Sequence, residues 1–320
     1  MSFTIDVHHH ILPGFFWEAT NDSAAPVGGL LPPPWTKEDA LAFLDDAQID
    51  FAVSSISAPG VHVGDDAAAR KLARRCNEYS ADLQRSHPKR FGTFACLPLP
   101  DTDGALIEIA YAVDELHVDG FIVFTNAEGV YLGDPRYDEV FAEFQRRKAV
   151  VFVHPTASPD PTAHALDLPD NLLDFPVDTS RAIARLLYSN TFARTKDVRF
   201  IFAHAGGTIP YLATRFAIID EMGFIPGAEQ RETAAETFRR LYWDTALSWG
   251  DPVLQTLKEV VGLERIVFGT DYPYLRRDLA VSCRDVFENS PVLTTDDRAA
   301  IFGGNALGLF PRLSALAAGN

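Results

Sequence analysis

The sequence predicts an α/β fold, a (β/α)8 TIM barrel that forms one domain over residues 1–320. Short apolar runs alternate with segments of helical period, which is typical of a parallel sheet. There are eight such pairs, a number that favours closure into a barrel over an open sheet. Histidines and an aspartate follow several of the apolar runs, and this is the rim at which barrels of this kind carry their active sites.

Each strand is expected where β-branched and aromatic residues cluster. In order, these runs are Phe3–Val7, Phe51–Ser57, Arg90–Cys96, Gly120–Phe124, Val150–Val153, Val198–Ala203, Leu241–Trp243 and Arg265–Phe268. Helices are expected between them, at Lys37–Gln48, Asp65–Ser86, Gly104–Leu116, Tyr137–Lys148, Asp178–Asn190, Ile209–Met222, Pro252–Val261 and Asp278–Phe287. Thr36, Asp178 and Asp251 stand where N-caps are expected.

Two segments lack a clean period and are expected to be long loops. Residues 11–35 are rich in Pro, Gly and aromatic residues, and residues 155–176 follow the fifth strand. Long loops in compact domains are often functional lids. We therefore expect these two loops to cover the active-site rim.

The composition of the chain disfavours several classes of binding partner. The formal net charge is −16 and the pI is near 4.9, so binding to the phosphate backbone of nucleic acid is disfavoured. A carboxylate ligand would need a local positive centre such as a metal or an arginine. No apolar stretch approaches the length of a membrane span, so no membrane association is expected. Three scattered cysteines and the absence of a signal-peptide pattern favour the reducing cytoplasm.

Polar residues at the strand ends carry the chemistry. Strand side chains alternate between faces, so His8 and His10 point the same way and His9 points the other. His154, His204 and Asp271 follow the fifth, sixth and eighth strands. Imidazole and carboxylate groups are the ligands that zinc and related divalent metals prefer. A single histidine at a strand end is more often structural, but together these residues predict one metal site.

The remaining histidines are less informative. His9 is expected to pack behind the first strand. His62 and His164 lie in loops on the active-site side and are left open as substrate contacts.

The motifs DVHHH, VFVHP, IFAHAGG and FGTDYPY occur in this order along the chain. With the closing IFGGNALGLF, they resemble the amidohydrolase superfamily, and in particular the amidohydrolase-related family 2. This branch includes aminocarboxymuconate semialdehyde, γ-resorcylate, 5-carboxyvanillate and 6-methylsalicylate decarboxylases. The resemblance covers essentially the whole chain.

The resemblance implies a role for each of these residues. His8, His10, His154 and Asp271 match the metal ligands, and His204 matches a catalytic acid/base or substrate contact. Asp271 is the expected proton donor. The fourth strand lacks the lysine of binuclear relatives, so we expect one divalent metal, zinc first and manganese as the alternative.

Substrate contacts are expected from aromatic residues and one arginine. In some relatives an arginine at the position of Arg215 reaches into the neighbouring subunit, which would imply a homodimer; the alternative is a surface ion pair. No arginine precedes Lys37, so a small monocarboxylate fits better than a dicarboxylate. The aromatic candidates, which could equally be lid packing, are Trp17, Trp35, Phe124, Phe175 and Tyr272.

We therefore expect a metal-dependent carboxy-lyase that removes carbon dioxide, without oxidation, from a salicylate-type or related unsaturated acid. The alternative is a hydrolase in which a metal-activated water cleaves an ester, a lactone or a C–C bond. A barrel that only binds ligands is disfavoured by the complete ligand set. The sequence contains neither a Gly-rich dinucleotide loop nor a G-x-S-x-G elbow.

Overall fold

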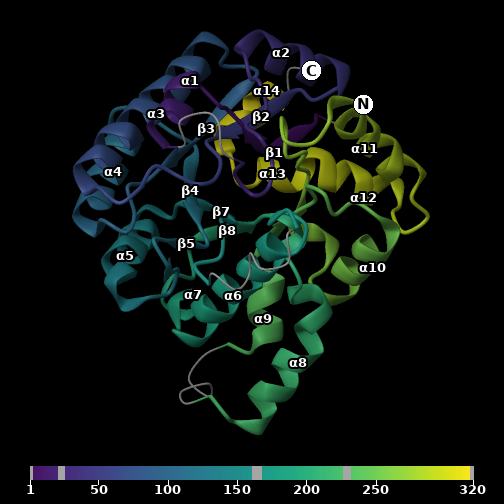
Figure 1. Cartoon of the computed structure of the whole chain (residues 1–320). Helices are drawn as coiled ribbons and strands as arrows, with labels where there is room; N and C mark the ends of the chain where they lie inside the picture. Colours follow the sequence, from purple (N-terminus) through teal and green to yellow (C-terminus); the bar gives the residue numbers. More distant parts are fainter. Residues whose placement is uncertain (1–2, 21–25, 161–167, 226–231, 318–320) are drawn as a thin grey trace.

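The computed structural model describes residues 3–20, 26–160, 168–225 and 232–317. Eight parallel strands stand side by side in the centre of the molecule, and helices surround them (Figure 1). The strands follow one another in the order β1 (Ile5–His10), β2 (Phe51–Ser55), β3 (Phe91–Cys96), β4 (Gly120–Phe124), β7 (Val150–His154), β8 (Arg199–Phe202), β9 (Tyr242–Asp244) and β10 (Ile266–Val267). Each strand therefore neighbours the next one along the chain, apart from a small hairpin of β5 (Asn126–Ala127) and β6 (Val130–Tyr131).

The first strand closes the barrel against the segment that follows the last strand. The Val7 backbone N–H donates to the Phe268 carbonyl over 3.0 Å, and the His10 N–H donates to the Tyr272 carbonyl over 2.7 Å. These bonds leave no open edge between β1 and β10. The predicted (β/α)8 barrel is confirmed.

Helices occur at each of the eight predicted segments, and further short helices occur that were not predicted. They are α1 (Gly14–Thr20), α2 (Lys37–Asp46), α3 (Asp66–Ser86), α4 (Thr102–Asp114), α5 (Asp138–Arg147), α6 (Asp174–Tyr188), α7 (Thr191–Arg194), α8 (Ile209–Met222), α9 (Ala234–Arg240), α10 (Asp251–Val260), α11 (Arg277–Asn289), α12 (Thr295–Ala299), α13 (Asn305–Leu307) and α14 (Ser314–Ala317). Helices α8 and α9 extend furthest from the barrel, at the bottom of Figure 1. No helix in the described ranges is both long enough and apolar enough to cross a membrane.

Some predicted boundaries and caps were wrong. Thr36 does cap α2, where its side chain accepts from the Asp39 N–H. Asp178 lies inside α6 and binds other side chains, because α6 begins four residues earlier at Asp174. Asp251 is the first residue of α10, and Gly250 occupies the cap without a side-chain bond.

The first long segment contains a helix that was not predicted. The segment 11–35 contains the short helix α1, in which Phe16 and Trp17 are buried. The first strand also continues three residues past Val7 to His10, so the histidines are part of the barrel wall rather than of the loop.

Two apolar clusters occupy the two faces of the strands. Along β7, Val151 and Val153 belong to the cluster that packs against the helices, whereas Val150 and Phe152 belong to the second cluster. The Phe152 ring lies 4.9 Å from the His8 ring, centroid to centroid. The second cluster therefore fills the barrel interior and ends directly beneath the histidines.

Candidate metal centre and active site

Four strand ends bring the predicted ligands together inside the barrel rim. His8 and His10 lie on β1, His154 ends β7, His204 follows β8, and Asp271 follows β10. All five side chains are buried. Ligand atoms of His8, His154, His204 and Asp271 lie within 4.8 Å of one another, and the His8 and His10 Nε2 atoms are 3.1 Å apart.

The spacing of these atoms fits a single divalent cation. Asp271 Oδ1 lies 3.2 Å from His8 Nε2 and 3.3 Å from His10 Nε2, yet it has no hydrogen-bond partner among the described residues. Ligands at about 2.0 Å around a tetrahedral metal stand about 3.3 Å apart. A buried carboxylate oxygen without a partner, at this distance from two imidazole nitrogens, is the arrangement expected around a metal ion.

Each of three histidines is oriented by a bond to its other ring nitrogen. Nδ1 of His8 lies 2.6 Å from Asp244 Oδ2, and Nδ1 of His10 lies 3.1 Å from the Ile56 carbonyl oxygen. Nδ1 of His154 lies 2.7 Å from the Pro155 carbonyl oxygen. When Nδ1 carries the proton and donates, the Nε2 lone pair is free for a metal.

Electrostatics favours a cation at the same point. Burial lowers the pKa of His154 well below its ordinary value, and the neighbouring His10, His8 and His204 lower it further. Burial likewise lowers the pKa of His10. Burial opposes ionisation of Asp271, but His8, His10 and His204 hold the pKa of this carboxyl well below its usual range. His10 and His154 are therefore neutral and Asp271 is ionised. Burial opposes protonation of His8, but Asp244 and Asp271 raise its pKa to about 10, so this ring carries a proton that a bound cation would displace.

Two further carboxylates, which the sequence analysis did not single out, support the ligands. Asp244 ends β9 and is fully buried; besides binding His8, it accepts the His204 backbone N–H over 2.8 Å. Asp6 accepts the His8 N–H over 3.0 Å and the Thr270 hydroxyl over 2.6 Å. An aspartate that ends a strand was the available signal for Asp244, but the seventh strand was expected to end at Trp243.

The backbone around two of the site residues is left-handed. His204 has a φ of 53°, Ala205 of 55° and Asp271 of 60°, a region that non-glycine residues seldom adopt. The next residue, Gly206, also has a positive φ, and a Cβ there would stand 2.0 Å from the Trp243 ring. This tight turn aims the His204 side chain inward: its Nε2 lies 3.4 Å from Asp271 Oδ2.

A small cavity of about 30 Å³ lies beside His154, His204 and Asp271. This volume holds about two water molecules. Both long segments contribute to its lining, with Val27, Gly28 and Leu30 from the first and Asn171 and Phe175 from the second. The other lining residues, which sequence reasoning missed, are Ser57, Ala58, Leu247 and Tyr274.

Some of the aromatic residues predicted to contact the substrate lie near the metal centre, and others do not. Phe175 lines the cavity, and Phe124 lies with its ring centroid 5.9 Å from that of His154. Trp17 is packed in the core and Trp35 lies against Tyr79. Neither of these two tryptophans is among the residues that line the cavity.

Tyr272 and Arg215 are not among the residues that line the cavity either. The Tyr272 ring stacks on His9 at 4.7 Å, which places both residues behind β1, as the alternation of strand side chains predicts for His9. Tyr274 lines the cavity instead. Arg215 is exposed on α8. Of the two loop histidines, His62 binds Asp66 over 2.8 Å, and His164 lies outside the described residues.

Residues 5–312 match the amidohydrolase family. The 6-methylsalicylic acid decarboxylase of Aspergillus aculeatus is 38% identical, over 97% of this chain and 96% of that protein. A second 6-methylsalicylic acid decarboxylase, from Penicillium expansum, is 34% identical over 98% and 97% of the two chains. These matches extend over the whole barrel.

A solved structure agrees with the fold. The dihydroxybenzoic acid decarboxylase of Polaromonas sp., which holds manganese and the inhibitor 2-nitroresorcinol, superposes with a TM-score of 0.81, covers 98% of each chain and is 24% identical. At this identity the likeness shows the fold. The buried histidine–aspartate cluster of the present chain is suited to hold a divalent metal, and the chain belongs to the amidohydrolase family.

Proposed function

We propose that this enzyme is a metal-dependent decarboxylase of small aromatic acids of the salicylate type. The proposal rests on the two carboxylate oxygens of Asp271, which face different groups. Its Oδ1 faces His8 and His10, whereas its Oδ2 faces His204. One carboxylate thus belongs both to the metal centre and to a possible path for a proton.

We assign the metal to His8, His10, His154 and Asp271, with zinc first and manganese as the alternative. A divalent cation there would supply a positive centre for the carboxylate and the adjacent hydroxyl oxygen of the acid. The negative net charge of the chain would repel an anionic substrate. The cation would offset this repulsion at the site.

Asp271 and His204 would move the proton. The reaction adds a proton to the ring carbon that bears the carboxylate; the bond to the carboxylate then breaks, its electrons return to the ring, and carbon dioxide leaves. Asp271 is ionised at rest, because its pKa is held well below the usual range. It therefore needs to receive a proton before donating one, and His204, 3.4 Å away, is the group placed to exchange it.

The residues that line this small cavity favour a neutral ring with one acid group, and their side chains would have to move apart to admit it. Its lining residues include Val27, Leu30, Leu247 and Phe175 and no lysine or arginine within the described ranges. A second carboxylate would have no cationic side chain to pair with there. A salicylate-type monocarboxylate satisfies both the apolar wall and the single positive centre.

The direct test is product analysis. The metal-loaded enzyme is incubated with salicylate and 6-methylsalicylate in D2O, and carbon dioxide and the phenol are measured. We expect equal amounts of the two products, with one deuterium at the ring carbon that lost the carboxylate. Asp271→Asn should abolish turnover, whereas Asp103→Asn, an exposed aspartate on α4, should not.

The alternative function is hydrolysis, and the same enzyme preparation tests it. Turnover of aryl esters or lactones, without carbon dioxide release from any acid of the series, would replace the decarboxylase proposal with a metal-activated water.

We also propose that the enzyme is a homodimer that uses the outer face of α8. Tyr211, Ile218 and Met222 are 87%, 49% and 54% exposed, and Arg215 lies between them at helical spacing. Such an apolar stripe on a helix that extends from the barrel (Figure 1) supports contact with a second copy. Light scattering should give a dimer for the native chain and a monomer for Ile218→Asp. A native monomer would overturn this assignment.

A further inference from the structure

A second and much larger cavity lies on the same rim, beside the metal centre. Its volume is about 400 Å³, whereas the cavity at the metal ligands has about 30 Å³. Pockets that bind small molecules in proteins typically measure 300–1,000 Å³. The larger space, which we name the side pocket, is therefore of the size that holds a small organic group.

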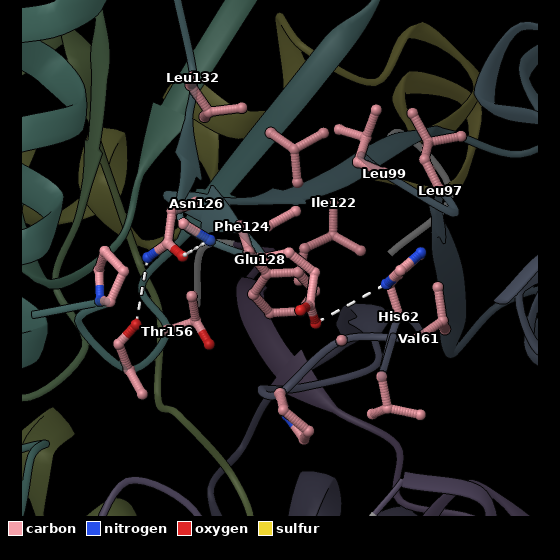
Figure 2. Close-up of a pocket in the computed structure, with 18 of the residues that line it drawn as sticks. Val61, His62, Leu97, Leu99, Ile122, Phe124, Asn126, Glu128, Leu132 and Thr156 are labelled. Atoms are coloured by element: carbon pink, nitrogen blue, oxygen red, sulfur yellow. Dashed lines mark hydrogen bonds and ion pairs between the residues drawn. The ribbon is translucent and has the colours of Figure 1, made fainter. Parts of the chain in front are cut away.

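One wall of the side pocket is apolar, and the lining also includes the buried polar residues Asn126, Thr156 and Tyr137. Its lining residues include Val61, Leu97, Leu99, Ile122 and Leu132. At the mouth, His62 and Glu128 face each other with their nearest nitrogen and oxygen 3.7 Å apart, as Figure 2 shows.

Charge and polarity limit what the side pocket can hold. No lysine or arginine is among its described lining residues, and Glu128 is acidic. A second anionic group would therefore find no partner in the pocket and would be repelled at its mouth. A neutral hydrocarbon group fits these walls.

Phe124 separates the side pocket from the metal centre. It ends β4, lines the side pocket and lies with its ring 5.9 Å from the His154 ring. On its other side is Gly60, where a Cβ would stand 3.0 Å from two carbons of the Phe124 ring. Any larger residue at position 60 would push this ring, so Gly60 leaves the space that the ring occupies.

We propose that the side pocket binds an alkyl substituent of the aromatic acid, and that Phe124 determines how long this substituent can be. The inference rests on the proposed decarboxylase function. With the carboxylate at the metal centre, a substituent in the 6-position lies beside the carboxylate. Rotation of the Phe124 side chain opens the way from there into the side pocket.

The affinity of the enzyme for the reaction product tests the role of the side pocket without requiring catalysis. Loss of carbon dioxide from a 6-alkylsalicylate leaves a 3-alkylphenol. The affinity of the metal-loaded enzyme for phenol and for 3-methyl-, 3-propyl- and 3-pentylphenol is measured by calorimetry. Because each buried methylene is worth a roughly threefold to fourfold gain in affinity, we expect the affinity to rise from phenol to 3-propylphenol.

Two variants test the location. Ala127→Phe, on the wall of the side pocket, should fill it and remove most of the gain from each methylene. Phe124→Ala should extend the gain to 3-pentylphenol. Ala142→Phe, on the exposed surface of α5, is the matched control and should keep the native ratio of affinities. Melting temperatures confirm that each variant is folded.

Equal affinity along the series in the native enzyme, or a gain that Ala127→Phe leaves intact, would overturn the proposal. Carbon dioxide release from 6-alkylsalicylates is measured in parallel. Carbon dioxide release together with a flat phenol series would refute the side pocket alone. A rising phenol series without carbon dioxide release from any acid would refute the decarboxylase function and leave the pocket assignment standing.

Discussion

Asp244 bonds the Nδ1 atom of His8 through one carboxylate oxygen, over 2.6 Å, and accepts the backbone N–H of His204 through the other, over 2.8 Å. A single buried carboxylate from β9 thereby orients a metal ligand on the first strand and the acid/base candidate after β8. Removing its charge should affect both groups at once.

Asp244→Asn should weaken metal binding by about 10–100-fold, the usual effect of losing a carboxylate behind a histidine ligand. The amide has one acceptor oxygen, which can face either His8 or the backbone N–H groups of His204 and Ala246, so one side would meet an N–H group. Competition with a coloured chelator measures the affinity, with Asp103→Asn as the surface control. Unchanged affinity in Asp244→Asn would show that the orientation of His8 does not depend on this bond.

Gly206→Ala should unfold more easily by about 2–4 kcal/mol, combining a clash with the Trp243 ring and a left-handed backbone. Gly223→Ala separates the two causes. Gly223 has a φ of +63° but no heavy atom within 4 Å of a built Cβ, so it should lose only about 1 kcal/mol. Urea unfolding measures both, and equal losses would mean that Trp243 moves aside.

Asp178→Ala should destabilise the rim by about 2–4 kcal/mol, because it leaves buried donors unpaired. The Asp178 carboxylate accepts from the Thr125 and Tyr131 hydroxyls and from the Asn126 amide. Asp178→Asn keeps one acceptor oxygen and should lose less. Urea unfolding compares the two variants; identical losses would argue that the bonds contribute little and that packing dominates.

Glu143→Gln should lower stability at neutral pH by about 1 kcal/mol. Hydrogen bonds from Arg146, and also from Arg147, lower the pKa of Glu143 to about 2, although partial burial opposes them. A carboxyl with a lowered folded pKa stabilises fully above its unfolded pKa of about 4.3 and loses this contribution as the pH falls towards 2.

The difference between Glu143→Gln and the native enzyme should therefore be constant from pH 7 to 5 and shrink by about half near pH 3. Glu139→Gln, an exposed glutamate on the same helix, is the control. A difference that stays constant down to pH 3 would rule out the ion pairs as its source.

The sequence contained enough information for the barrel and for the ligand cluster. Strand alternation alone separated His8 and His10 from His9, and the structure places the His9 ring against Tyr272 behind the strand. The sequence could not predict where the side chains of the long segments pack. Trp35 packs against Tyr79 on α3, a contact that depends on the path of the chain and not on any period.

The ends of the strands and the local backbone conformation explain the other differences between the predicted and the observed site. Asp244 was missed because the seventh strand runs one residue further than expected, to Asp244 itself. Tyr272 was also expected at the site. The left-handed φ of Asp271 changes the direction of the chain there, so that Tyr274 and not Tyr272 reaches the cavity. Local backbone handedness of this kind has no periodic signature.

The metal ligands come from both ends of the chain, with His8 and His10 on the first strand and Asp271 after the last. On the ribosome, β1 emerges early but its partner segment at Phe268–Tyr272 is made only when most of the chain is already outside. The centre therefore cannot nucleate folding during synthesis. The ligand set is complete only after the last strand has been made, and a chain truncated before residue 271 would have neither a closed barrel nor a complete site.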